Sequence, residues 1–281
     1  SGGANTAQLM WLVGEGGYVA NSANRGASWT APASPVTTRL NGVATPDGTQ
    51  AFAVGQGGVI LRAGGTTGGW FSDPSPVTDE LHAVSCASSS SCFAVGDQAT
   101  ILVWNGQRFL LQERASGAGA PRYLAVHAWM EATGGRRTVV VGTGGVVRHS
   151  STSTFATSAI AGGGTLVAVD SARSTTPGYV LAANDTGAVF RSDDGGASWS
   201  PAGSLPPGVK LTGIAIGGSG RWFASTEAHG AFTSADHGAS WVPLETNFRG
   251  RFDFVYSPPG NSSWLGGAGG ALLYTPYQNG L

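Results

Sequence analysis

Charge is scarce in this chain of 281 residues: Asp, Glu, Lys and Arg make up 11% of it, and the formal net charge is −1. So low and balanced a charge gives no general attraction for nucleic acid or for an anionic membrane surface. The chain also lacks a long apolar run that would span a membrane and a phosphate-binding loop that leads into a helix. The sequence therefore predicts no nucleic-acid partner, no membrane insertion and no cofactor.

Potential metal ligands are also few. The five histidines are scattered, none in a His-x-x-x-His spacing, and the two cysteines, Cys86 and Cys92, have no histidine between them. This predicts no metal site. Both ends of the segment 84–95 are typical of strands, so a hairpin would bring the two thiols together. We expect a disulfide, with two neighbouring reduced thiols as the alternative, and a disulfide implies an oxidising compartment and hence an exported protein.

Glycine, in contrast, is abundant, with 46 residues, and it falls in periodic turns. In seven places an apolar stretch runs into a turn, glycine-rich in most of them, and out into a second apolar stretch. The starts of these units are 40 to 46 residues apart, and the units span residues 11–18, 52–59, 93–100, 139–146, 179–189, 222–232 and 264–272. A repeat of this length with hairpin chemistry in each unit predicts an all-β protein, a β-propeller with seven blades.

The second unit shows what one blade contains. Residues 40–44, 50–54 and 59–62 are typical of strands, a fourth strand begins near residue 69, and residues 45–49 form a turn. Four antiparallel strands make one propeller blade. The chain is thus predicted to be a single domain, 1–281, with blades at approximately 4–31, 40–72, 81–112, 122–156, 165–201, 211–243 and 252–277.

The two end blades are short. The first lacks its opening strand and the last lacks a clear fourth strand. Either the termini complete each other to close the ring, or the natural domain extends beyond this chain. Closure is favoured, because an open array would leave strand edges unpaired.

Blades 1, 5 and 6 carry a further motif, Ser-x-Asp/Asn-x-Gly-x-x-Trp, at residues 22–29, 192–199 and 234–241. It resembles the Asp-box, or BNR repeat, of sialidases, sortilin-type propellers and the photosystem II assembly-factor family. In its hairpin turn the Asp or Asn oxygen bonds backbone N–H groups, the Gly takes a positive φ and the Trp packs beneath. The resemblance implies a structural role for these residues: Asn24, Trp29, Asp194, Trp199, Asp236 and Trp241.

Together with the recurring phrase aromatic-x-Val-Gly-x-Gly-Gly-x-Val, the Asp-boxes make the protein most similar to the photosystem II stability/assembly-factor-like propellers. The resemblance is one of repeat pattern and covers nearly the whole sequence. It implies a non-catalytic binding or assembly module, and such propellers also occur in exported bacterial proteins.

The residue just before the first strand of each blade is charged in most blades. It would lie on one rim of the central channel, and the six positions are Arg39, Glu80, Arg122, Thr165, Lys210 and Arg251. The four basic ones predict a local positive ring that could bind a carboxylate, an acidic peptide or the C-terminus of a polypeptide, because Arg binds carboxylates in bidentate fashion. The resemblance supports this, because the assembly factors are thought to bind their client through an arginine patch. The alternative is solvated loop charges, some of them paired with Asp79, Glu80, Glu245 or Asp253.

The second position of the same strands would face the channel. Its occupants are Asn41, His82, Leu124, Val167, Thr212 and Asp253. The polar ones are expected to bond buried water. His82 and Asp253 form the one pair among them that resembles acid–base chemistry, and we keep both as binding candidates without assigning catalysis.

A glycan-binding or glycoside-hydrolase propeller is the alternative function. The turns between second and third strands place Glu15, Gln56, Asp97, Thr143, Asp185 and Glu227 on the same rim, where paired carboxylates could flank a sugar. Trp70 and Trp104 would support a lectin if they were exposed, although packing within the blades is favoured for both. The Arg-Ile-Pro motif of sialidases is absent, so that family's activity is not carried over.

The sequence thus predicts a non-catalytic, exported module that binds a protein or peptide client. Its proposed site comprises Arg39, Arg122, Lys210 and Arg251, with His82 and Asp253.

Overall fold

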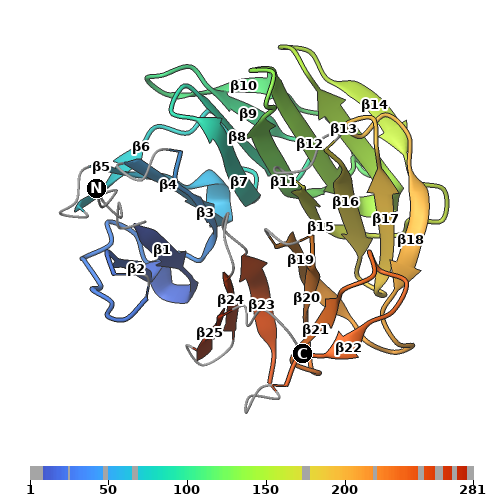
Figure 1. Ribbon diagram of the computed structural model, residues 1–281. Helices are drawn as coiled ribbons and strands as arrows, with labels where there is room; N and C mark the ends of the chain where they lie inside the picture. Colours follow the sequence, from blue (N-terminus) through green and yellow to red (C-terminus); the bar gives the residue numbers. More distant parts are fainter. Residues whose placement is uncertain are drawn as a thin grey trace. The chain divides into compact units, whose positions relative to one another are not determined.

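The computed structural model describes residues 9–24, 26–46, 50–64, 69–172, 178–217, 220–245, 250–256, 262–267 and 271–276. They form two compact units, Ser1–Met130 and Glu131–Leu281, which we describe one at a time. Strands, turns and three short 3-10 segments make up the described residues, with no α-helix among them (Figure 1). The predicted all-β class is therefore confirmed. The predicted turn residues 47–49 and the predicted blade ends at residues 4 and 277 lie outside the described residues.

The first unit consists of antiparallel sheets in sequence order. Strands β1 (Met10–Val13) and β2 (Val19–Ser22) pair with each other. The next sheet has the strand order β3 (Leu40–Ala44), β4 (Gln50–Gly55), β5 (Ile60–Gly64), β6 (Gly69–Asp73). The one after it has the order β7 (Leu81–Ser88), β8 (Ser91–Gly96), β9 (Ile101–Trp104), β10 (Phe109–Glu113), and β11 (Tyr123–Met130) contacts β7.

The second unit repeats the same order. Strands β12 (Arg136–Gly142), β13 (Val146–Ser150) and β14 (Ala156–Ala159) pair in sequence. Two four-stranded sheets follow, made of β15 (Leu166–Ser171), β16 (Val180–Asn184), β17 (Ala188–Ser192) and β18 (Ser200–Ser204), and of β19 (Leu211–Ile216), β20 (Trp222–Thr226), β21 (Ala231–Ser234) and β22 (Val242–Pro243). The last sheet contains β23 (Phe252–Tyr256), β24 (Ser262–Gly267) and β25 (Ala271–Pro276).

The second strand of each sheet forms the core. Strands β4, β8, β16 and β20 are buried along almost their whole length. They are covered on a face by the first strand of the next sheet, as β4 is by β7, β16 by β19 and β20 by β23. A strand covered on both faces needs apolar residues without alternation, which is the pattern of Phe52-Ala-Val-Gly55.

Polar side chains of the first strands join neighbouring sheets. Asn41 Nδ2 donates to the backbone oxygen of Leu81 at 2.8 Å, and Thr212 Oγ1 donates to that of Phe252 at 2.6 Å. Nearer the other end of these strands, the side chains of Ser85 and Asp170 accept backbone N–H groups of the next sheet in the same way. Asn41 and Thr212, for which the sequence suggested buried water as the partner, thus bond the backbone of the neighbouring sheet.

A disulfide links β7 and β8. Cys86 and Cys92 are directly opposite in the strand register, and their sulfur atoms are bonded. The hairpin predicted from the sequence is therefore confirmed, together with its disulfide.

No helix among the described residues is long and apolar enough to cross a membrane.

The Asp-box turns have the predicted geometry. In the box at residues 192–199, Asp194 Oδ1 accepts the N–H of Ser198 at 2.9 Å, and Ser192 Oγ accepts the N–H of Gly196 at 2.8 Å. Gly196 has a φ of 102°, and Trp199 Nε1 donates to the backbone oxygen of Gly196 at 3.0 Å. The indole thus closes the turn from beneath.

The other two boxes repeat the bonds from the backbone to the Asn or Asp side chain; Trp29 Nε1 also donates to the oxygen of Gly26 at 3.2 Å, whereas Trp241 Nε1 has no such bond among the described residues. Asn24 Oδ1 accepts the N–H of Ser28 at 2.8 Å, and Asp236 Oδ1 accepts the N–H of Ser240 at 2.9 Å. The glycines of these boxes also have positive φ, 78° at Gly26 and 88° at Gly238. The structural role predicted for the boxes follows from these bonds.

Candidate functional site

Two sets of loops meet at one end of each sheet. The N–H of the turn residue after the second strand donates to the backbone oxygen of the residue before the first strand. This bond recurs at 2.9–3.0 Å in four sheets, as Gln56–Arg39, Asp97–Glu80, Asp185–Thr165 and Glu227–Lys210. The turn carboxylates and the residues before the first strands therefore lie at the same sheet ends, as predicted.

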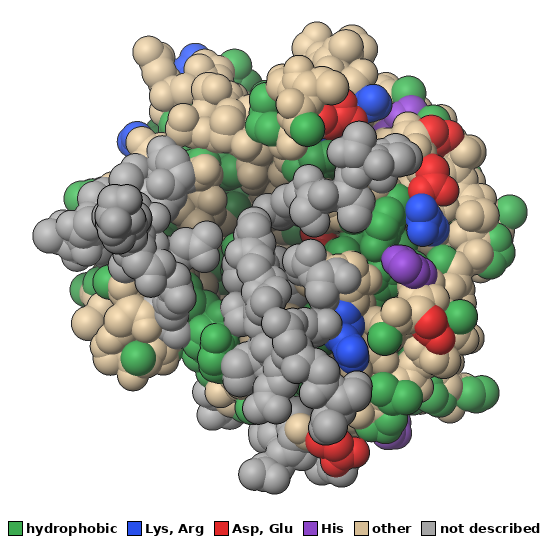
Figure 2. Space-filling view, viewed as in Figure 1, with side chains coloured by type: hydrophobic (Ala, Val, Ile, Leu, Met, Phe, Trp, Pro, Cys, Tyr) green, Lys and Arg blue, Asp and Glu red, His purple; other side chains and the backbone are tan. Residues whose placement is uncertain are grey.

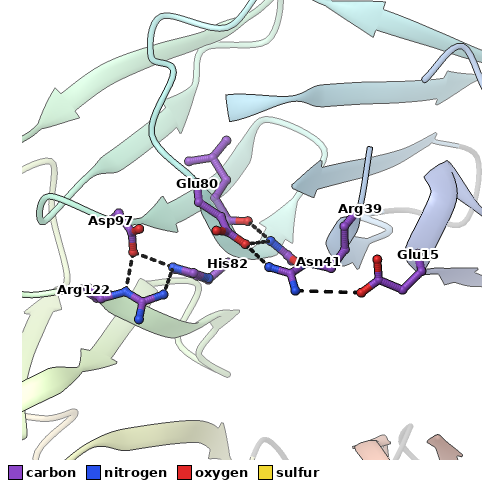
Figure 3. A network of polar contacts seen from close by, with 8 residues as sticks. Glu15, Arg39, Asn41, Glu80, His82, Asp97 and Arg122 are labelled. Carbon is purple, nitrogen blue, oxygen red and sulfur yellow. Dashed lines mark hydrogen bonds and ion pairs between the residues drawn. The ribbon is translucent and has the colours of Figure 1, made fainter. Parts of the chain in front are cut away.

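Arg39 lies between two carboxylates in the first unit (Figure 3). Its guanidinium pairs with Glu80, and its Nη1 lies 3.8 Å from Glu15 Oε1. Asn41 Nδ2 donates to Glu80 Oε1 at 3.0 Å. Glu80 is therefore held from two sides, while Arg39 keeps 44% of its side chain exposed.

Asp97 is the centre of a second cluster in the same unit (Figure 3). Its Oδ1 lies 2.7 Å from Nε2 of His82 and 2.6 Å from Nε of Arg122. Arg122 Nη2 lies 3.2 Å from the same His82 nitrogen. Since Asp97 can only accept, we assign the Nε2–H tautomer to His82, which donates to Asp97.

Both acidic residues are held in the ionised form. Partial burial raises the pKa of Glu80, but hydrogen bonds from Arg39 and Asn41 lower it further than burial raises it. Burial likewise raises the pKa of Asp97, and the hydrogen bonds from His82 and Arg122 bring it below its ordinary value. These two carboxylates therefore stay charged at neutral pH and orient the guanidinium groups beside them.

The second unit contains a comparable cluster around Glu227. Its two carboxylate oxygens lie 3.6 Å from Lys210 Nζ and 3.6 Å from Arg251 Nη1. Arg251 also pairs with Asp253 through its Nε. The hydrogen bond to Asp253, with the charge of that carboxylate, raises the pKa of Arg251. His82 and Asp253, the pair that resembled acid–base chemistry, thus each bond a different partner.

The ion pairs follow a rule that the aligned repeats did not reveal. A basic residue before the first strand of one sheet reaches the acidic turn residue of the preceding sheet, as in Arg39–Glu15, Arg122–Asp97 and Arg251–Glu227. The sequence does contain this pattern: each of these basic residues pairs with the acidic turn residue one repeat earlier, not with the turn residue of its own repeat. Lys210 instead pairs with Glu227 of its own sheet. All four predicted basic residues thus have carboxylate partners, so each cluster is balanced in charge rather than positive.

Charge is sparse on the part of the surface that Figure 2 shows. On the face that Figure 2 shows, Lys, Arg, Asp and Glu side chains are scattered among apolar and uncharged ones. Among the described residues, no group of three or more His, Cys, Asp or Glu could hold a metal ion.

Trp70 and Trp104 are buried, with 5% and 3% of their surface exposed. Trp70 packs edge-on against Trp11 with ring centroids 5.0 Å apart, and Trp104 packs against Phe52 at 4.6 Å. The packing within the blades that the sequence favours for both indoles is therefore confirmed, and neighbouring aromatic rings occupy the surface that a sugar would need.

Comparison with known proteins identifies the fold. No family model matches the sequence, and no curated protein does. Among solved structures, YCF48 from Cyanidioschyzon merolae aligns over 98% of this chain and 93% of its own, with 17% identity and a TM-score of 0.71. The protein is a β-propeller. Among the described residues, five of its sheets are four-stranded and antiparallel, and its resemblance to YCF48, a photosystem II assembly factor with Asp-box repeats, is structural.

Two further structures support the same fold. One, described as "YCF48 bound to D1 peptide", aligns over 85% of this chain and 77% of its own, with 16% identity and a TM-score of 0.63. The other is the Cps50 (Swd1) beta-propeller domain of Myceliophteria thermophila, with 12% identity, coverage of 97% and 94%, and a TM-score of 0.73. At these identities the likeness describes the fold alone.

Proposed function

We propose that this propeller is a non-catalytic module that binds a peptide segment of a client protein at the loop ends of its sheets. The observation that carries the proposal is the pair of half-exposed guanidinium groups of Arg39 and Arg122, each held by an ionised carboxylate. A guanidinium has five N–H donors, and in Arg39 the contacts with Glu80 and Glu15 use only part of them. The remaining donors are held in place for a ligand.

The chemistry of this site selects a polar peptide that carries a carboxylate. The client carboxylate binds the half-exposed guanidinium of Arg39 or Arg122, while Glu15, which is 81% exposed, accepts a donor of the same peptide. Lys210 and Arg251 offer a similar set of donors in the second unit, where Glu227 and Asp253 hold them. A charge-balanced site of this kind selects a peptide by the positions of its charged groups rather than by its net negative charge.

The similarity to YCF48 supports a peptide as the client, since a YCF48 structure is described as bound to a D1 peptide. The structures reported above are an assembly factor and a propeller domain of Cps50, which agrees with a binding role. We further propose seven blades in a single domain, with a short first and last blade, because hairpin units recur seven times along the sequence. The Cys86–Cys92 disulfide supports an exported location.

The glycan alternative is less well supported. Burial removes Trp70 and Trp104 as stacking platforms. A glycosidase needs one carboxyl with a raised pKa to act as general acid, whereas the pKa values of Glu80 and Asp97 are lowered.

An array of immobilised peptides, with and without carboxylates, tests the proposal beside a glycan array. We expect carboxylate-bearing peptides to bind, and the double variant Arg39→Gln/Arg122→Gln to lose about tenfold or more in affinity, since charged hydrogen bonds contribute about 1.5–3 kcal/mol each. Arg62→Gln is the matched control: Arg62 is also ion-paired, with Asp73, and 40% exposed, yet it lies on β5 away from the loop ends. Equal binding by the double variant, or binding of glycans alone, would contradict the proposal.

A further inference from the structure

Strand β10 forms the outer edge of its sheet, whose order is β10-β9-β8-β7 (Figure 1). It carries two exposed leucines, Leu110 at 41% and Leu111 at 46%. An exposed apolar edge strand is a template for pairing with another strand, and proteins usually protect such edges with proline, charge, shortness or a covering segment.

The outer strands of the second unit, in contrast, show this protection. Ser158 on β14 donates to the backbone oxygen of Gly196 in the next Asp-box, at 2.7 Å. Gly203 on β18 lies so close to Gly238 that a Cβ there would be 1.9 Å from its backbone oxygen. Strand β22 has two residues, the second of which is Pro243. The sequence of β10, Phe-Leu-Leu-Gln-Glu, contains no proline or glycine and reaches a charge only at Glu113.

The backbone of β10 also presents its groups to the open edge at defined positions. The backbone oxygen of Arg108 accepts the N–H of Asn105, on the β9 side. Because backbone groups alternate in direction along an antiparallel strand, those of Leu110 also point to β9, and those of Phe109 and Leu111 point outward. The free donors and acceptors are therefore centred on Leu110.

A bulge determines which side chains share a face. Leu110 is opposite Val103 and Glu113 is opposite Ile101, with the register shift between Leu111 and Glu113. Val103 and Ile101 are two residues apart and share one face of β9, so Leu110 and Glu113 share one face of β10. Arg108, two residues before Leu110, lies on that face as well.

From these positions we infer that β10 pairs antiparallel with β10 of a second copy of this protein, about a two-fold axis at Leu110. Phe109 and Leu111 of one copy then exchange backbone hydrogen bonds with Leu111 and Phe109 of the other. Leu110 meets its own counterpart at a position without these bonds, where side chains approach most closely. In a regular strand Arg108 would lie opposite Gln112 of the second copy. Because the bulge adds one residue before Glu113, Arg108 lies opposite Glu113 instead, and the two-fold axis repeats this ion pair.

This charge complementarity is what selects a second copy over an unrelated strand. Arg108 precedes the strand and Glu113 ends it. Both find an opposite charge in an antiparallel partner strand only if that strand also begins with a positive residue and ends with a negative one. Two four-stranded sheets thereby become one continuous sheet, in an isologous contact. Because a single strand pair buries less than about 1,200 Å², the dimer should be weak and concentration-dependent.

Sedimentation velocity over a concentration series, from micromolar to several hundred micromolar at low salt, tests the inference. We expect the wild type to shift reversibly toward a dimer as its concentration rises. Leu111→Pro removes an N–H that points outward, which an edge strand tolerates, and should abolish the dimer while circular dichroism and the thermal midpoint of the monomer stay close to wild type. Phe71→Lys is the matched control, since it replaces a 66%-exposed aromatic on the neighbouring outer strand β6 and should leave the dimer unchanged.

Exchange of the two charged residues provides a second, independent test of the dimer. Arg108→Glu places like charges opposite each other and should weaken association about tenfold, whereas Arg108→Glu/Glu113→Arg restores the opposite pairs and should restore the dimer. A wild type that stays monomeric over the whole series, a dimer that survives Leu111→Pro, or a double exchange that fails to recover what Arg108→Glu loses would overturn the inference.

Discussion

Glycine is required at single positions of the turns between second and third strands. Gly57 and Gly58 have φ values of 70° and 75°, and a Cβ on Gly58 would lie 2.2 Å from the backbone oxygen of Val77. In the equivalent turn after β8, Gln98 and Ala99 occupy the same left-handed region, with φ values of 57° and 53°. A side chain in that conformation costs about 1–2 kcal/mol, so the turn after β8 is strained where the turn after β4 is not.

We therefore expect opposite effects from two exchanges. Gly58→Ala should lower the free energy of unfolding by about 2 kcal/mol or more, because the unfavourable φ and the contact with Val77 add together. Ala99→Gly should leave it unchanged or raise it by up to about 1 kcal/mol, since relief of φ is partly offset by the greater entropy of glycine in the unfolded state.

Urea unfolding of both variants beside the wild type measures the two effects. A Gly58→Ala variant as stable as the wild type would mean that the turn can move away from Val77, against the close approach described above.

At the scale of the element, the Asp-box turn is a unit whose parts are replaceable. Asn24 accepts the N–H of Ser28 through Oδ1 as Asp194 accepts that of Ser198, so an amide oxygen supports the turn as well as a carboxylate. The charge matters in another respect. Partial burial raises the pKa of Asp194, but hydrogen bonds from the hydroxyl and N–H of Ser198 and from Ser192 lower it to about 2.

This shift makes part of the stability depend on pH. Because the pKa of Asp194 is lower in the folded state, its carboxylate stabilises the fold above the ordinary pKa of about 3.8, and that contribution is lost as the pH falls toward about 2. Asp194→Asn should keep the turn and lose this part of the acid sensitivity. Solvent exposure limits the difference to less than about 1 kcal/mol.

Guanidinium unfolding of the wild type and Asp194→Asn at a series of pH values between 2 and 6 checks this point. Stability curves that stay parallel across that interval would show that Asp194 has the same pKa in the folded and unfolded states.

The strands and the Asp-box turns are the parts of the structure that the sequence predicted best. The strand ranges 40–44 and 50–54 agree with β3 and β4, and the Asp-box glycines take the positive φ expected of them. Both follow from local chemistry, either apolar pattern or turn residues. The pairing of Arg39 with Glu15 and of Arg122 with Asp97 did not follow, because it depends on how neighbouring sheets are offset. Packing of Trp70 and Trp104 within the blades was favoured from the sequence, but their aromatic neighbours Trp11 and Phe52 could not be named, since these are distant in sequence.

At the scale of the molecule, the sheets of each unit are joined by bonds from side chain to backbone. Thr212 Oγ1 donates to the backbone oxygen of Phe252 and lies 3.0 Å from Ser225 Oγ, so a single hydroxyl connects two sheets. Repeat proteins derive their stability from such contacts between neighbours as well as from each repeat itself.

Thr212→Val keeps the shape of this side chain and removes its donor. The oxygen of Phe252 then loses a partner, and the free energy of unfolding should fall by about 1–3 kcal/mol. Hydrogen exchange should become faster in β23, in the next sheet. Thr233→Val is the control, because Thr233 donates to Trp222 within a single sheet and should leave exchange in β23 unchanged. Equal exchange in β23 for Thr212→Val and the wild type would contradict the joining role.

Lys210 has a consequence for how this protein can be studied in solution. It is the single lysine of the sequence, 71% of its side chain is exposed, and it belongs to the loop-end cluster of Glu227 and Arg251. An amine-reactive dye therefore has one side-chain target, and that target lies in the proposed binding region. The molecule thus has a built-in attachment point for a fluorescent reporter, without an engineered cysteine that would compete with the native disulfide.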